Sequence, residues 1–379
     1  MLPILTLLSL SLSLVHGLVV PDLQPKDRST PLQLDFKVSH TVGNITAREF
    51  WANHQSQTSK RGVSSQVIVD YRDLCYHIDV YLGSNKQKNT VILDTGSADL
   101  WVPHEGYSPD LSSTSKSTSD QFSIGYIDGS EASGDIFLDT LTFETEQPVL
   151  PNFLFARASS NADFGVLGIA DKGQEAVDYT YNNLPWALQA AGVIPKASYS
   201  LFLGPRGGSG SLVLGGIDTE KYIGELAQYA IDNDSGGLGV KVNSVSVGGH
   251  PVAVDAAMLL DSGTTLGLLN HALMAELDVA FSTTIKDIGG VQYRYTSCHQ
   301  PSDKYLHFNF GSNTIAIPYS EAIFKQNDGT CLLGFGWYQD LQILGDIFLR
   351  HAYVYYNLSD QTISLAQASY SESSNIISA

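Results

Sequence analysis

From residue 64 onward, short apolar runs alternate with polar residues, and turn residues such as Gly, Pro, Asn and Ser separate the runs. Runs of this length and period predict β-strands. The predicted strands cover residues 64–71, 76–82, 89–93, 121–127, 134–143, 199–203, 210–214, 240–247, 252–260, 305–309, 314–317, 342–344, 351–357 and 362–366. Helical spacing predicts helices at only three places, residues 184–191, 270–281 and 318–324, with Asn270 as an N-cap. The Ser/Thr-rich tract 112–119 is predicted to be a loop. The pattern is that of an all-β protein.

One short motif occurs twice. Residues 91–97 read VILDTGS and residues 258–264 read MLLDSGT, so each copy is an apolar strand that ends in Asp, followed by a hydroxyl residue, Gly and a second hydroxyl residue. An apolar segment with Gly follows each copy, at residues 164–168 and 342–346. An internal repeat of this kind predicts two related halves, and therefore a bilobal β architecture with a pseudo-twofold axis.

Asp94 and Asp261 end the two repeated strands. A buried carboxylate there is costly unless it is hydrogen-bonded or shares a proton. The two copies of the motif contain three pairs of matching residues that can stabilise these carboxylates. Gly96 and Gly263 let backbone amides face the carboxylates, Ser97 and Thr264 can donate hydroxyl bonds, and Thr95 and Ser262 can tie each loop to the opposite backbone.

Two carboxylates a few ångströms apart cannot both ionise cheaply, so one proton is shared and the pair titrates as a unit. The ionised partner can take a proton from a water that attacks a peptide carbonyl, while the protonated partner stabilises the oxyanion. This chemistry needs no metal, cofactor or covalent intermediate. In a single Asp-Thr-Gly motif, the aspartate would more often be a turn residue whose carboxylate is hydrogen-bonded by local amides. Two such motifs, each after three apolar residues, favour a catalytic pair.

The N-terminal region predicts export and processing. Residues 1–17 are apolar and uncharged and predict a signal peptide cleaved after Gly17; the run is shorter than the roughly 20 residues of a membrane anchor. Residues 18–61 end in Lys60-Arg61, which predicts a pro-segment removed at a basic pair, although such pairs are also common on surfaces. The remaining chain divides into predicted lobes at 62–215 and 216–379.

Charge narrows the choice of partners. The formal net charge is −18, and residues 1–61 hold six basic and four acidic residues, which leaves 15 basic and 35 acidic residues beyond them. A surface this acidic argues against nucleic acid or an anionic membrane as a partner. It suits acidic surroundings, where carboxylates become neutral and self-repulsion falls.

Three cysteines in an exported chain predict one disulfide and one thiol. Cys298 and Cys331 flank a predicted hairpin region, and Cys75 is predicted to be a buried thiol. The ten histidines show no metal-like spacing. Sequons at Asn44, Asn233 and Asn357 predict a glycoprotein without deciding which asparagine is modified.

The chain resembles the pepsin-like aspartic proteases over residues 64–368. The resemblance rests on both Asp motifs, extended to 94–103 and 261–265, and on residues 164–170, 214–218 and 343–350. It implies a bilobal fold and a secreted, monomeric acid endopeptidase of proteins and peptides that its own pro-segment inhibits. The Cys298/Cys331 pair is similar to the family's C-terminal-lobe disulfide. The Lys-Arg-ended pro-segment and residues 84–88 are similar to yeast candidapepsins.

Residues 122–130 resemble the family's flap, a hairpin that closes over the substrate. The resemblance implies that Tyr126 bonds the indole of Trp101, that the flap backbone up to Gly129 and Ser130 binds an extended peptide, and that Asp128 favours Lys or Arg before the cut. On residue type alone, a plain hairpin and a solvated turn Asp remain alternatives. Two features depart from the family: Ile127 replaces the usual Gly, and the N-terminal lobe has no cysteine pair.

Two other functions remain open from the sequence. A non-catalytic pepsin-fold peptide-binding protein would usually have lost an Asp or a supporting Gly, and neither is lost here. A glycosidase with paired carboxylates would not be expected to carry the symmetric Asp-x-Gly frame, and an assay of peptide against glycan hydrolysis would separate it.

Overall fold

The computed structural model describes residues 30–39, 75–126, 130–143, 149–160, 162, 164–206, 208–288, 291–326, 328–338 and 341–379. The predicted signal peptide, the Lys60-Arg61 pair, the strand at 64–71, Asn44 and the flap residues Ile127, Asp128 and Gly129 lie outside them. For Cys75, the structure describes the backbone and not the side chain.

The described chain is built almost entirely from strands, with three α-helices and a few short 3₁₀ turns. The strands are β1 (Leu32–Ser39), β2 (Cys75–Leu82), β3 (Gln87–Asp94), β4 (Leu100–Val102), β5 (Lys116–Gly125), β6 (Glu131–Phe143), β7 (Leu150–Ala158), β8 (Gly165–Gly168), β9 (Ser198–Phe202), β10 (Gly210–Leu214), β11 (Gly216–Asp218), β12 (Tyr222–Ala230), β13 (Gly239–Val247), β14 (His250–Leu260), β15 (Gly267–Leu269), β16 (Thr284–Ile288), β17 (Val291–Thr296), β18 (Tyr305–Asn309), β19 (Thr314–Pro318), β20 (Ile323–Lys325), β21 (Cys331–Leu333), β22 (Phe335–Trp337), β23 (Ile343–Leu344), β24 (Ala352–Asn357), β25 (Thr362–Ala368) and β26 (Ile376–Ser378). The helices are α2 (Leu184–Ala190), α3 (His271–Ala280) and α4 (Asp346–Leu349).

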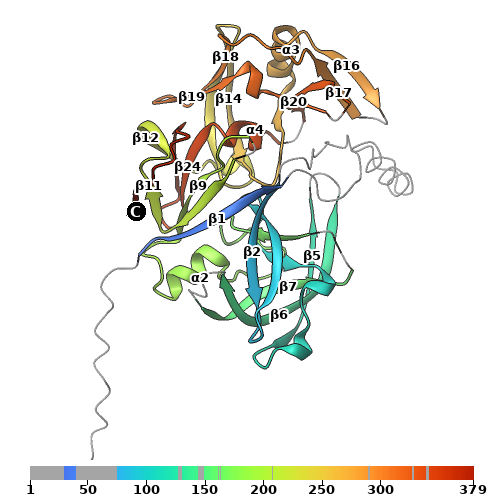
Figure 1. The fold of residues 1–379 in the computed structure, drawn as a ribbon, viewed down its shortest axis with the longest axis vertical. Helices are drawn as coiled ribbons and strands as arrows, with labels where there is room; N and C mark the ends of the chain where they lie inside the picture. Colours follow the sequence, from blue (N-terminus) through green and yellow to red (C-terminus); the bar gives the residue numbers. More distant parts are fainter. Residues whose placement is uncertain are drawn as a thin grey trace, which may run out of the picture.

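Two β-rich lobes face each other, and strands from both halves of the sequence meet in one large sheet (Figure 1). That sheet has the strand order β12-β25-β24-β9-β10-β1-β2-β3-β8-β4-β7-β6-β5, and β14, β15 and β23 belong to a second, seven-stranded sheet. The predicted bilobal all-β fold is confirmed. The predicted lobe boundary at 215/216 stays a prediction, because the late strands β24 and β25 return to pair beside β9.

The sequence repeat corresponds to a structural repeat. Strand β3 runs parallel to β8, with Leu93 opposite Leu167 and Asp94 opposite Gly168. Strand β14 runs parallel to β23 in the same way, with Leu260 opposite Leu344. In each half a short parallel partner therefore holds the end of the strand that delivers an aspartate. The apolar residues before each aspartate are buried, except Ile92, which is half-buried.

Most predicted elements lie where the pattern placed them. Strands β10 and β18 match residues 210–214 and 305–309, and helices α2 and α3 match the first two predicted helices. The side chain of Asn270 accepts a hydrogen bond of 2.9 Å from the amide of Leu273, so it caps α3 as predicted.

Two local predictions are wrong. The predicted helix at 318–324 is a single 3₁₀ turn at Tyr319–Glu321, followed by β20. The Ser/Thr-rich tract 112–119 is a loop only in its first part, because β5 begins at Lys116. In both cases pairing with a neighbouring strand, β21 or β6, overrides the local pattern.

The predicted disulfide between Cys298 and Cys331 is present. It joins the residues after β17 to β21, which pairs with β17 at Thr296 opposite Cys331. Both cysteines are therefore held close by the sheet itself, and the third cysteine, Cys75, starts β2.

Candidate active site

The two aspartates at the repeat have matching hydrogen-bond environments. Asp94 accepts a bond of 2.7 Å from the amide of Gly96 on one oxygen and one of 2.5 Å from the hydroxyl of Ser97 on the other. Asp261 accepts bonds of 2.8 Å from the amide of Gly263 and 2.5 Å from the hydroxyl of Thr264. Each carboxylate is only 6% exposed, so these donors replace the water that each would otherwise bind.

Thr95 and Ser262 connect the two loops across the lobe boundary. The hydroxyl of Thr95 donates to the carbonyl of Leu260 at 2.8 Å and accepts from the amide of Ser262 at 2.9 Å. The hydroxyl of Ser262 donates to the carbonyl of Leu93 at 2.9 Å and accepts from the amide of Thr95 at 3.1 Å. All four bonds are buried, so they hold the two motifs in a fixed relative position.

The two glycines are required by close approach of the loops. A Cβ atom added to Gly96 would lie 2.7 Å from a carboxylate oxygen of Asp261, and one added to Gly263 would lie 2.5 Å from a carboxylate oxygen of Asp94. Any side chain at either position would therefore collide with the opposite aspartate. Each glycine lets the carboxylate from the other lobe approach its loop.

Burial raises the pKa of Asp261 well above its usual value, and the negative charge of Asp94 raises it further. The bonds from Thr264 and Gly263 act in the opposite direction because they stabilise the ionised form. A raised pKa beside a second carboxylate is what a pair sharing one proton requires.

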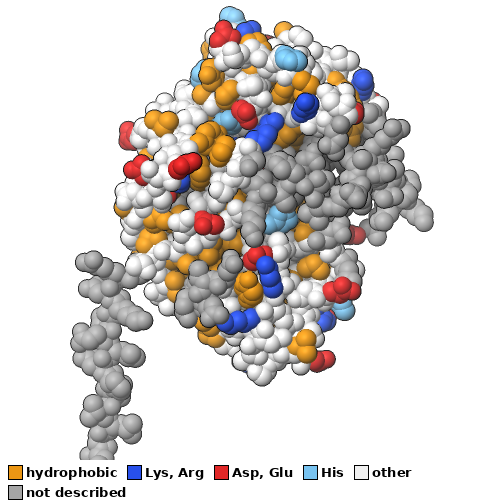
Figure 2. All heavy atoms as spheres, in the orientation of Figure 1, with side chains coloured by type: hydrophobic (Ala, Val, Ile, Leu, Met, Phe, Trp, Pro, Cys, Tyr) orange, Lys and Arg blue, Asp and Glu red, His pale blue; other side chains and the backbone are white. Residues whose placement is uncertain are grey.

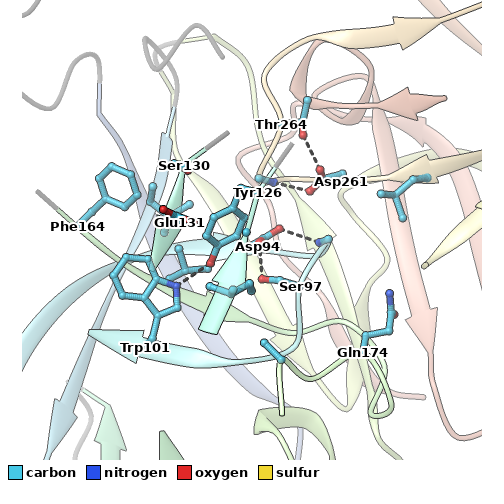
Figure 3. A pocket seen from close by; sticks show the side chains of 18 of the residues that line it. Asp94, Ser97, Trp101, Tyr126, Ser130, Glu131, Phe164, Gln174, Asp261 and Thr264 are labelled. Carbon is cyan, nitrogen blue, oxygen red and sulfur yellow. Dashed lines mark hydrogen bonds between the residues drawn. The ribbon is translucent and has the colours of Figure 1, made fainter. Parts of the chain in front are cut away.

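The aspartates lie at the base of a cavity of about 540 Å³ (Figure 3). The flap hairpin, made of β5 and β6, contributes Tyr126, whose hydroxyl accepts a bond of 2.7 Å from the indole nitrogen of Trp101. The amide of Tyr126 bonds the carbonyl of Ser130, which closes the described part of the hairpin. Tyr126, Trp101 and Ser130 all line the cavity with the two aspartates, whereas Asp128 and Gly129 lie outside the described residues.

The cavity also has lining residues that sequence reasoning did not single out. Glu131 begins the second flap strand, Gln174 and Ala176 come from the irregular segment after β8, and Leu341 comes from the other half of the chain. No local pattern marks these residues, because only the fold brings their segments to the cavity.

Comparison with known proteins agrees with this geometry. The family model "Eukaryotic aspartyl protease" matches residues 75–368. The chain is 35% identical to "Secreted aspartic protease 6" of Candida albicans, covering 97% of this chain and 93% of that protein. It is 36% identical to "Candidapepsin-3" of the same species, covering 90% and 91%. The crystal structure of the aspartic proteinase from Irpex lacteus matches with a TM-score of 0.69 at 24% identity, over 82% of this chain and 97% of that one.

A bilobal β fold with one aspartate from each lobe at a shared cavity is characteristic of the pepsin-like aspartic proteases, and this chain has both features. The chain belongs to the eukaryotic aspartyl protease family and is an aspartic endopeptidase.

Within the described part of the chain, no three His, Cys, Asp or Glu side chains are grouped so that they could hold a metal ion. No helix among the described residues is both long and apolar enough to cross a membrane.

Proposed function

We propose that this chain is a secreted endopeptidase that cleaves proteins and peptides at acidic pH, with Asp94 and Asp261 activating one water between them. The observation that carries the proposal is the matched pair of buried carboxylates, each with an amide and a hydroxyl donor, at the base of one cavity. The relatives named as secreted proteases support export of this chain.

The arrangement accounts for general acid–base catalysis. The outer donors Ser97 and Thr264 and the amides of Gly96 and Gly263 fix both carboxylates, so that neither has to reorganise during the reaction. With one proton shared between the pair, the ionised carboxylate takes a proton from a water as its oxygen bonds to the peptide carbonyl carbon. The protonated carboxyl donates to the carbonyl oxygen, and proton transfer to the amide nitrogen then lets the C–N bond break.

Substrate binding follows from the hairpin over the cavity. A flap strand can bond an extended peptide through its backbone, which gives affinity without requiring one sequence. We place Trp101, Tyr126, Ser130, Asp128 and Gly129 in this binding role, and the cavity lining and the Trp101–Tyr126 bond support the first three.

We further propose that residues 18–61 are an inhibitory pro-segment of a monomeric enzyme. Strand β1 belongs to this range, and it pairs with β10 on one side and with β2 on the other. Leu34 and Phe36 are 6% and 2% exposed, and the ring of Phe36 packs edge-on against Tyr76. The segment is therefore anchored in the sheet, and cleavage after Lys60-Arg61 would have to be followed by release of β1.

A non-catalytic peptide-binding role has no observation in its favour, since both carboxylates and all of their donors are in place. The deciding experiment is cleavage of a denatured protein between pH 3 and 6, with and without a statine-type inhibitor that mimics the tetrahedral intermediate. Asp94→Asn and Asp261→Asn should each reduce kcat by at least about a hundredfold. Substantial activity in either variant, or insensitivity to the inhibitor, would contradict the mechanism.

A further inference from the structure

The described lining of the cavity is acidic. Besides Asp94 and Asp261 it includes the carboxylate of Glu131, and it includes no Lys, Arg or His. Glu131 is the first residue of β6 and is exposed. No hydrogen bond or ion pair joins its side chain to another described residue, so the carboxylate is available to a ligand.

Space is open beside Glu131. Across the hairpin it lies directly opposite Gly125, and residues directly opposite in an antiparallel pair point to the same face. Gly125 has no side chain, and a Cβ atom added to it would meet no atom within 4 Å. The hairpin therefore leaves room next to this carboxylate on the side where both residues line the cavity.

The cavity that Glu131 lines also has an apolar wall. Figure 3 shows Glu131 on the same side of the cavity as Phe164, Trp101 and Tyr126, with Asp261 and Thr264 on the other side. Trp101 and Val166 are buried in the small apolar cluster beneath the flap, and Phe164 packs against that cluster. A cavity lined by apolar side chains and by one further carboxylate complements a lysine or arginine side chain, whose methylene stem is apolar and whose head is a cation.

We propose that Glu131 is a specificity-determining residue that pairs with the cation of a Lys or Arg side chain of a peptide bound in the cavity. This assignment rests on the proposed endopeptidase function and names part of its substrate class. The excess of acidic residues in the whole chain acts in the same direction, because it attracts basic segments at longer range. Figure 2 shows Asp and Glu side chains on both halves of one face, with Lys and Arg side chains among them.

The test uses peptides in matched pairs, identical except for Lys or norleucine at one position, with the position moved stepwise across the cleavage site. They are assayed at pH 5.5, where glutamate side chains are normally ionised. The readout is the ratio of kcat/KM for the Lys peptide to that for the norleucine peptide. At one position, Glu131→Gln should lower this ratio roughly threefold to tenfold, mainly through KM of the Lys peptide. Glu131→Lys should lower it further.

Asp135→Asn is the matched control. Asp135 lies on the same strand, outside the cavity lining, and pairs with Arg157, so its loss should leave the ratio unchanged. An unchanged ratio in Glu131→Gln at every position would overturn the assignment, as would a ratio that responds to Asp128→Asn and not to Glu131→Gln. If the wild-type protein cleaves norleucine peptides, either result leaves the endopeptidase function intact. Failure of the wild-type protein to cleave any peptide would overturn both.

Discussion

The hydroxyl of Tyr181 donates a hydrogen bond of 2.7 Å to the carboxylate of Asp99, in the loop that follows Asp94. The other oxygen of Asp99 accepts the amide of Ala176 at 2.8 Å. Asp99 is 3% exposed, so these two donors replace its water. Because Gln174 and Ala176 line the cavity, Asp99 holds one cavity wall in place from within the catalytic motif.

Asp99→Asn should therefore impair substrate binding. An asparagine can accept through only one of its two side-chain atoms, so one of the two bonds is lost and the wall formed by Ala176 shifts. We expect KM for peptides to rise roughly fivefold with a smaller change in kcat, and the free energy of unfolding to fall by about 1–3 kcal/mol.

A second buried aspartate provides the control for this prediction. Asp139 is 1% exposed and accepts bonds of 2.6 Å from the hydroxyl of Tyr107 and 2.7 Å from the amide of Thr140, but it is not part of the cavity lining. Asp139→Asn should cost similar stability and leave KM unchanged. Equal effects of the two variants on KM would remove the positioning role of Asp99.

The raised pKa of Asp261 should contribute stability that is lost as the pH rises above about 4, the ordinary pKa of an aspartate. Burial and the charge of Asp94 raise the pKa of Asp261, so the folded state holds a proton that the unfolded chain has released, and this contribution is lost as the pH rises through the folded-state pKa. Burial also raises the pKa of Asp99, which acts in the same direction.

Two buried histidines act in the opposite direction, so the effect of Asp261 has to be measured as a difference between two proteins that share them. Burial lowers the pKa of His351 to about 3 and also lowers the pKa of His77, so both favour folding more as the pH rises towards the unfolded value of about 6.5. The free energy of unfolding of the wild-type protein minus that of Asp261→Asn should therefore fall as the pH rises from about 4 in denaturant unfolding, because both proteins contain the same histidines. A slope that is the same in both proteins would contradict the raised pKa of Asp261.

The repeat made the centre of this site predictable, because the two Asp motifs specify both the catalytic pair and the symmetry that joins them. The two strands that end in these aspartates were predictable as well, because each carries a short run of apolar residues that is mostly buried. Strand β1 was not among the predicted strands, although Leu32, Leu34, Phe36 and Val38 alternate with polar residues as in a half-buried strand, and it pairs with β10 and β2. Glu131 and Ala176 carry no motif and reach the cavity only through the tertiary fold.

Phe36 offers a test of whether β1 leaves the enzyme on maturation. Phe36 is 2% exposed, and its ring packs directly on Gly210, where an added Cβ atom would lie 2.1 Å from the ring. Phe36→Ala should lower the free energy of unfolding of the full-length precursor by about 3–5 kcal/mol. The mature protein, beginning at Gly62 by N-terminal sequencing, should be unchanged by the substitution. A mature protein that still contains the β1 peptide, or begins elsewhere, would contradict release after Lys60-Arg61.

The two sequons within the described residues differ in a way that predicts which one carries a glycan. Asn233 is exposed at the start of a 3₁₀ turn. Asn357 is 6% exposed, donates from its side-chain nitrogen to Asp360 at 2.9 Å and accepts the amide of Asp360 at 3.0 Å. A glycan would replace one of the two hydrogens of that nitrogen, and the buried side chain leaves it no room in the folded turn.

We therefore expect the mature protein, secreted from a yeast host, to carry its N-linked glycan on Asn233. Endoglycosidase treatment should lower the mass of the wild-type protein and of Asn357→Gln, and it should not change the mass of Asn233→Gln. Asn357→Gln should be less stable, because the turn loses its bonds to Asp360, by about 1–3 kcal/mol. A glycopeptide containing Asn357, or a glycan that persists in Asn233→Gln after removal of the pro-segment, would show that the exposure of these asparagines does not decide the site.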